Sequence, residues 1–193
     1  MITLWLGACA VVPVPEQDPD AWVLDAESFG EEAYASCASC HLADGSGRPD
    51  GSVPRLAGQL PEVLEAKLRS IAAGELDLPV MAPFARALSD AEIGLVAEHL
   101  SGLPVVPDVV GVPDPLGAPL YVAHCAACHG LGGEGHAGLL APRVCGQHAG
   151  YVLRRLATQG ERADADPAMT AVVAGLDEEQ RVAIADHLAR CAP

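Results

Sequence analysis

Two short motifs hold most of the chemically reactive side chains of this 193-residue chain. Residues 37 to 41 read CASCH and residues 125 to 129 read CAACH. A Cys-x-x-Cys-His run is the attachment signature of c-type haem, in which two thiols form thioethers with the porphyrin and the adjacent histidine binds the iron. The sequence therefore predicts two covalently bound haems. The residues that would hold them are Cys37, Cys40 and His41 for the first haem, and Cys125, Cys128 and His129 for the second.

Two other kinds of site use a Cys-x-x-Cys pair, and the surroundings of these motifs disfavour both. A thioredoxin-like redox pair follows a strand in a βαβ unit, and strand signals are nearly absent from this chain. A zinc ribbon places its second pair about 15 to 20 residues after the first. Here Cys40 and Cys125 are separated by 84 residues. Haem attachment is the interpretation that remains.

The composition is that of a globular, acidic protein. Half of the residues are hydrophobic, but aromatic residues make up only 4%, so two small domains would have thin cores unless a haem filled each of them. Lys and Arg number 11 against 26 Asp and Glu, which gives a formal net charge of −15. Nucleic acid is excluded as a partner because its phosphates require a basic surface. The acidity serves either solubility or steering towards a basic partner.

The N-terminus resembles the leader of a lipoprotein, and the sequence predicts no membrane-spanning helix. No run of about 20 apolar residues occurs anywhere in the chain. The first apolar stretch is short for a signal peptide and has no Lys or Arg before it. Residues 6 to 9, LGAC, do resemble the lipobox of bacterial lipoproteins, in which the cysteine is lipidated. Cys9 is therefore a candidate lipidation site, through which the protein would associate with a membrane.

The chain is a tandem duplication with an offset of 88 residues. PRLAGQ at residues 54 to 59 returns as PRVCGQ at residues 142 to 147, and no insertion interrupts the later matches. Between the copies, four prolines favour an extended connector. The predicted organisation is a leader over residues 1–25, a first domain over 26–103, a linker over 104–116 and a second domain over 117–193.

Each copy is predicted to form three main helices. The first carries a glycine and a tyrosine four residues apart, and the small glycine indicates a close helix contact. The second runs from Pro61 to Gly74 in one copy and from Ala149 to Gly160 in the other. The third begins at a capping box, in which a side chain at the helix start and one three residues later cap each other's backbone. The paired residues are Ser89 with Glu92 and Asp177 with Gln180.

The sixth iron ligand decides whether the iron stores an electron or binds a substrate. Met81 and Met169 lie at the same position of the repeat, in segments predicted to be loops, and the only other methionine is Met1. We therefore expect them to be the second axial ligands. His99 and His187 are also repeated, but both fall inside the third helix, where a surface or domain-contact role is expected. A thioether ligand favours ferrous iron and so raises the reduction potential.

Together these features resemble the tandem dihaem class I cytochromes c, the c-four type of bacterial periplasmic electron carriers, over residues 27 to 191. The resemblance implies an all-α protein of two tandem class I cytochrome c domains, each with three main helices around a covalently bound haem. It also implies export to the periplasm, and transfer of electrons to a terminal oxidase or another respiratory acceptor. By the same resemblance, the carbonyls of Pro54 and Pro142 would accept a hydrogen bond from the proximal histidines.

Two cysteines remain outside these assignments. In class I cytochromes the loop that holds Cys145 packs near the end of the last helix, so the resemblance implies a disulfide between Cys145 and Cys191. Two buried free thiols and ligation of iron by Cys145 are the alternatives. The latter would suit a dihaem peroxidase or thiosulfate-oxidising enzyme, and a cytochrome subunit docked on a dehydrogenase is a third function. We expect an electron carrier and not an enzyme, because the paired methionines would close both irons.

Overall fold

The computed structural model describes residues 21–107, 109, 111–161 and 165–191. Within these residues the chain is helical, with one isolated β-bridge between His136 and Ala141 and no strand. The first domain contains α1 (Ala21–Tyr34), α2 (Ala38–His41), α3 (Pro61–Ala73), α4 (Ala82–Ala87) and α5 (Asp90–Gly102). The second contains α6 (Gly117–His124), α7 (Ala126–His129), η1 (Ala137–Leu139), α8 (Ala149–Ala157), η2 (Gln159–Glu161), α9 (Pro167–Ala174) and α10 (Glu178–Arg190).

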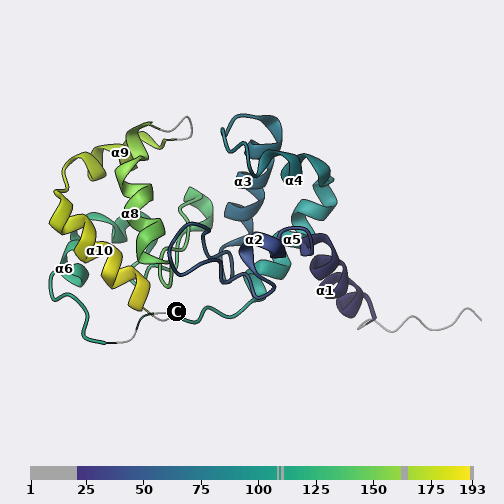
Figure 1. Cartoon of the computed structure of the whole chain (residues 1–193), viewed down its shortest axis with the longest axis horizontal. Coiled ribbons are helices and arrows are strands. Elements are labelled where there is room, and N and C mark those ends of the chain that lie inside the picture. Colours follow the sequence, from purple (N-terminus) through teal and green to yellow (C-terminus); the bar gives the residue numbers. More distant parts are fainter. Residues whose placement is uncertain (1–20, 108, 110, 162–164, 192–193) are drawn as a thin grey trace, which may run out of the picture.

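The two domains lie side by side and repeat one helical arrangement (Figure 1). In the first domain α5 packs against both α1 and α3, and in the second α10 packs against both α6 and α8. The predicted all-α fold, with three main helices packed together in each copy, is therefore confirmed. The described residues between α5 and α6 contain no helix. Their prolines cannot donate the backbone hydrogen bonds of a helix interior.

A glycine in the first helix of each domain allows the close crossing that the sequence predicted. A Cβ on Gly30 would lie 2.9 Å from the carbonyl oxygen of Leu95, and one on Gly117 would lie 2.7 Å from Cβ of His187. The tyrosine one turn later packs at a tilt against the histidine of the last helix. The ring centroids lie 5.6 Å apart for Tyr34 and His99 and 5.5 Å apart for Tyr121 and His187. The surface or domain-contact role expected for the two histidines is therefore wrong, because each fills the helix crossing of its own domain.

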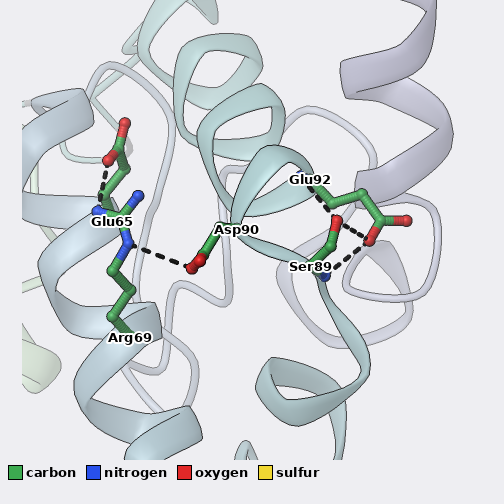
Figure 2. Close-up of polar contacts among 5 residues, drawn as sticks. All are labelled: Glu65, Arg69, Ser89, Asp90 and Glu92. Atoms are coloured by element: carbon green, nitrogen blue, oxygen red, sulfur yellow. Dashed lines mark hydrogen bonds and ion pairs between the residues drawn. The ribbon is translucent and has the colours of Figure 1, made fainter.

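Both predicted capping boxes form. Ser89 accepts a hydrogen bond from the backbone N–H of Glu92, whose carboxylate accepts from the backbone and hydroxyl of Ser89 in return (Figure 2). Arg69 of α3 lies between Glu65 and Asp90 (Figure 2). Its Nη1 is 2.6 Å from Oε2 of Glu65, and its Nε is 3.8 Å from Oδ1 of Asp90. In the second domain Asp177 and Gln180 make the equivalent exchange at the start of α10. These caps satisfy N–H groups that have no partner inside the helix.

The second helix of the second domain differs from the expected one. It was predicted to continue to Gly160, but α8 ends at Ala157 and a separate 3₁₀ turn follows. The hydroxyl of Thr158 donates to the carbonyl of Arg154 at 2.9 Å. The backbone N–H of Thr158 donates to the same carbonyl at 3.1 Å, so Thr158 caps the last turn of α8. Side-chain bonds to the local backbone of this kind are typical of helix ends and turns.

None of the helices in the described residues is long and apolar enough to cross a membrane. The candidate lipidation site Cys9 lies outside the described residues.

Candidate haem sites

Each Cys-x-x-Cys-His motif lies on one short helical turn directly after the first helix. Cys37 precedes α2 and Cys125 precedes α7, and each turn ends at the histidine. This geometry brings both thiols and the imidazole of a motif to one short segment. Burial raises the pKa of the Cys37 thiol, and burial together with the nearby Cys128 raises that of Cys125 to about 11. The four cysteines of the two motifs are partly or fully exposed, so porphyrin can reach them.

The proximal histidines are oriented by the predicted proline carbonyls. Nδ1 of His41 lies 3.1 Å from the carbonyl oxygen of Pro54, and Nδ1 of His129 lies 2.9 Å from that of Pro142. A hydrogen bond from Nδ1 leaves the lone pair of Nε2 for a metal. His41 is only 5% exposed, and its burial lowers the pKa of the imidazole, which favours the neutral form that binds iron.

A buried tyrosine ties each motif to the loop behind it. The hydroxyl of Tyr34 donates to the carbonyl of Leu42 at 2.8 Å, and that of Tyr121 donates to the carbonyl of Gly130 at 2.5 Å. Burial raises the pKa of Tyr121 to about 12, so the hydroxyl stays protonated and remains a donor. The residue after each proximal histidine is thus held in place.

The two methionines do not lie in plain loops. Met81 is the N-cap residue of α4, and Met169 is the third residue of α9, so the loop expectation is wrong for Met169. Pro167 begins α9, and Asp166 accepts a hydrogen bond from the backbone N–H of Met169 at 2.9 Å. This capped start forms a short helix that the sequence pattern did not reveal.

The methionines pack differently around the two sites. Met169 and Cys125 pack against the same core cluster, while Met81 and Cys37 pack against two neighbouring clusters that share Leu68. Both methionines are partly buried. Their role as iron ligands stays a prediction.

The leftover cysteines meet in the second domain. The structure pairs Cys145 with Cys191, with Cα atoms 5.4 Å apart, which lies within the usual range for a disulfide. Cys145 is 2% exposed and sits before α8, whereas Cys191 follows α10. Because the sulfur of Cys145 is paired with Cys191, it is not available to bind iron, which argues against Cys145 as an iron ligand. Formation of the bridge in the mature protein stays a prediction.

The polar groups beside the sites suit a haem. Arg143 follows the proline that accepts from His129, and within the described residues its Nε is buried without a hydrogen-bond partner. A buried cationic donor of this kind fits a haem propionate. Its counterpart Arg55 is 4% exposed and donates from Nη1 to the carbonyl of Val106. The thiols, the imidazoles and these donors are together the groups that a covalently attached haem needs.

Two glutamines that were not predicted to be functional join the two sites. The side-chain amide of Gln59 bonds to the backbone of Arg143, and that of Gln147 bonds to the backbone of Arg55. His148 at the start of α8 also approaches the carbonyl of Ser46 at 2.7 Å. The only signal in the sequence was the repeated glutamine that ends PRLAGQ and PRVCGQ. Repetition shows that a residue matters to both copies, but not that it reaches the other one.

Comparison with known proteins agrees with this geometry. The family model described as "Cytochrome C oxidase, cbb3-type, subunit III" matches the chain twice, over residues 26–100 and 114–188. The chain belongs to the dihaem class I cytochromes c of the cytochrome c4 type. This dihaem cytochrome is an electron carrier with two covalently bound c-type haems.

Relatives of the cytochrome cover most of its length. It is 29% identical to the thiosulfate dehydrogenase electron acceptor of Stutzerimonas stutzeri, over 94% of this chain and 91% of that protein. It is also 29% identical to cytochrome c4 of Pseudomonas aeruginosa, over 82% of this chain and 85% of the relative. The crystal structure of reduced recombinant cytochrome c4 from Pseudomonas stutzeri superposes with a TM-score of 0.73 at 27% identity, covering 86% of this chain and 98% of that one.

Proposed function

We propose that this cytochrome is a periplasmic one-electron carrier that accepts electrons from a sulfur-compound dehydrogenase and delivers them to a respiratory acceptor such as a terminal oxidase. The observation that carries the proposal is the doubled site, in which each Cys-x-x-Cys-His turn has its histidine fixed by a proline carbonyl. The name of the Stutzerimonas relative, an electron acceptor of thiosulfate dehydrogenase, supports this class of donor.

The residues divide the work at each site. Cys37 and Cys40 would attach the first haem, and His41 and Met81 would bind its iron. Cys125, Cys128, His129 and Met169 would do the same for the second. When bound, the two haems supply two one-electron sites that alternate between ferric and ferrous iron. A histidine and a methionine bound to each iron would leave no position for a substrate, so the chemistry that the haems would supply is electron transfer alone.

The chain's own residues reduce the structural change that accompanies each electron. The proline carbonyls and the tyrosine hydroxyls hold the histidine and the backbone next to it. A hydrogen bond to Nδ1 of the histidine fixes the orientation of the ring and raises the basicity of the ligand. A site that is already arranged for both oxidation states exchanges electrons with little rearrangement.

The charge is unevenly divided between the domains. Residues 26–103 hold twelve Asp and Glu against five Lys and Arg, whereas residues 117–193 hold eight against six. The first domain would therefore attract a basic partner surface more strongly than the second. Membrane association through a lipidated Cys9 would keep the carrier near membrane-bound partners. Mass spectrometry of the mature N-terminus from the native host tests that anchor.

A potentiometric titration followed by optical and EPR spectra tests the carrier function. We expect two low-spin His/Met haems, rapid reduction and oxidation, and no turnover of peroxide or thiosulfate by the isolated protein. A high-spin haem together with substantial peroxide or thiosulfate turnover would refute the carrier and favour a dihaem enzyme.

A permanent cytochrome subunit of a dehydrogenase is the second candidate. The name of a relative from Chlorobaculum tepidum, the cytochrome subunit of sulfide dehydrogenase, favours it; that relative is 35% identical over 40% of this chain and 68% of its own length. Affinity purification from the native host at moderate salt separates the two. Stoichiometric recovery with a dehydrogenase supports the subunit, and recovery of the cytochrome alone supports the mobile carrier.

A further inference from the structure

The peptide unit between Pro142 and Arg143 has hydrogen-bond partners in both domains. Its carbonyl oxygen lies 2.9 Å from Nδ1 of His129, the proximal histidine of its own domain. Its N–H donates to Oε1 of Gln59 in the first domain at 2.7 Å. Nε2 of the same glutamine donates to the carbonyl oxygen of Arg143 at 3.0 Å. One glutamine amide thus engages the peptide next to the histidine of the opposite domain.

The first domain receives the same contact from the second. The carbonyl of Pro54 lies 3.1 Å from Nδ1 of His41, and the N–H of Arg55 donates to Oε1 of Gln147 at 3.0 Å. Nε2 of Gln147 donates to the carbonyl of Arg55, also at 3.0 Å. The two glutamines are 88 residues apart, so the repeat brings one contact to both histidines in a crossed arrangement.

Neighbouring groups fix how each amide points. Oε1 of Gln59 also accepts the backbone N–H of Leu60 at 3.1 Å, and Oε1 of Gln147 accepts that of His148 at 3.0 Å. Each oxygen therefore faces two donors while each nitrogen faces a carbonyl, which leaves one amide orientation that satisfies all the bonds. The linker residue Val105 packs on the two glycines that precede the glutamines, Gly58 and Gly146.

We propose that Gln59 and Gln147 are positioning residues that lower the reduction potential of the haem in the opposite domain. The inference rests on the proposed ligation of iron by His41 and His129. When the N–H of Arg143 donates to Gln59, the peptide unit between Pro142 and Arg143 becomes more polarised. Its carbonyl oxygen then accepts a stronger hydrogen bond from His129. A stronger bond at Nδ1 makes the imidazole more basic and favours ferric iron.

A purely structural role for the glutamines predicts a different pattern. Four hydrogen bonds across the contact would hold the domains together whichever haem they lie near, and their loss would then affect both haems alike or neither. Tuning through the peptide instead predicts that a substituted glutamine shifts the midpoint potential of the haem in the other domain. The haem in the same domain as the substituted glutamine keeps its midpoint potential and is the internal control.

The test uses the full-length holoprotein with Gln59→Met and Gln147→Met, which keep the length of the side chain but remove the amide. Potentiometric titration gives two midpoints for each variant, and each midpoint is assigned by the NMR signals of the axial methionines with Met81→Ala and Met169→Ala as references. We expect Gln59→Met to raise only the midpoint of the second haem. The variant Gln147→Met should raise only that of the first.

Two further variants separate tuning from loosening of the contact. The variant Gln59→Glu keeps an acceptor for the N–H of Arg143, so the midpoint of the second haem should remain at or below that of the wild type. The variant Val105→Ala weakens the packing of the linker but leaves both glutamine contacts in place, so neither midpoint should change.

A shift of the haem in the same domain as the changed glutamine, equal shifts of both haems, or no shift would overturn the inference. The spectrum of the wild-type protein tests the ligation independently. His/Met spectra with unshifted variants would reject the tuning while leaving the electron carrier intact.

Discussion

Gly51 of the first domain and Gly150 of the second meet with no room for a side chain between them. A Cβ on Gly150 would lie 2.7 Å from the carbonyl oxygen of Asp50. Arg154 of α8 donates to the carbonyl of Gly51 beside this contact. The loop that leads to Pro54 is therefore held by the first turns of α8 in the other domain.

The variant Gly150→Ala should destabilise this contact by about 1–3 kcal/mol, because the added methyl group must displace backbone. Differential scanning calorimetry should show a lower Tm, and small-angle scattering should show whether the domains separate. Gly102→Ala is the matched control, since a Cβ there meets nothing within 4 Å. Equal stability of Gly150→Ala and the wild type would mean that the domains are not in contact at this loop.

Loss of either methionine should open one iron without releasing its haem. The variants Met81→Ala and Met169→Ala keep both thioether cysteines, so the covalent haem count should remain two by mass spectrometry. Each should gain binding of carbon monoxide or cyanide at one haem only, because the unchanged domain keeps its sixth ligand. Spectra identical to the wild type in both variants would refute the ligand assignment.

The Cys145 to Cys191 bridge should be present in exported protein, because an unpaired cysteine pair oxidises outside the cytoplasm. It spans a sequence separation of 46, for which the chain-entropy model gives an upper figure of roughly 4 kcal/mol. Mass mapping without reduction should find the linked peptide. The variant Cys145→Ala, which places in this copy the alanine found at position 57 of the other, should lose thermal stability but keep its haem spectrum.

Reductant provides the control for the bridge. Thiol reductant should lower the Tm of the wild type towards that of Cys145→Ala and leave the variant unchanged. Two alkylatable thiols in native protein that was never reduced would rule the bridge out. A changed haem spectrum in Cys145→Ala alone would revive iron ligation by this cysteine.

The capping box of α5 should make the first domain sensitive to acid. Hydrogen bonds from Ser89 hold the pKa of Glu92 below its usual value. Because the pKa of Glu92 is lower in the folded than in the unfolded protein, its carboxylate stabilises the folded state at pH values above its unfolded pKa. This stabilisation is lost as the pH falls through its folded pKa. Glu92→Gln resembles the cap of the second domain, which uses Gln180, and should remove this component from a plot of Tm against pH. An unchanged plot would contradict the assignment.

Electron exchange with a basic partner should slow as salt rises, because screening weakens the attraction of the acidic chain. Stopped-flow rates with a basic redox protein measure this. Neutralising the exposed pair Glu31 and Glu32 in the more acidic domain should slow the reaction more than neutralising the exposed pair Glu178 and Glu179 in the other. A rate that is independent of salt would indicate that the acidic residues serve solubility and do not steer the partner.

Local sequence determined the chemistry of the haem sites. Both Cys-x-x-Cys-His motifs form single turns, and each proline carbonyl that holds a histidine lies 13 residues after it. The two residues of a capping box lie only three positions apart, so these boxes too were predictable. Interactions of this kind depend on short segments whose conformations are set by nearby residues, and sequence spacing describes them well.

Medium-range structure was less predictable. Met169 was expected in a loop, yet Asp166 and Pro167 start a short helix that includes it. The helix before it ended at Ala157, where the hydroxyl and the backbone N–H of Thr158 both bond to the carbonyl of Arg154. In both places a side chain bonds to the backbone of its own segment, and the hydrophobic pattern carries no record of such a bond.

The tertiary structure alone decided how the two copies face each other. Gln59 and Arg143 are separated by 84 residues and Gly51 and Gly150 by 99, and no periodicity links either pair. A tandem repeat gives both copies the same groups but does not state which surfaces meet. Burial of complementary surfaces makes that choice, and here it sets the glutamine of one domain on the peptide beside the proximal histidine of the other.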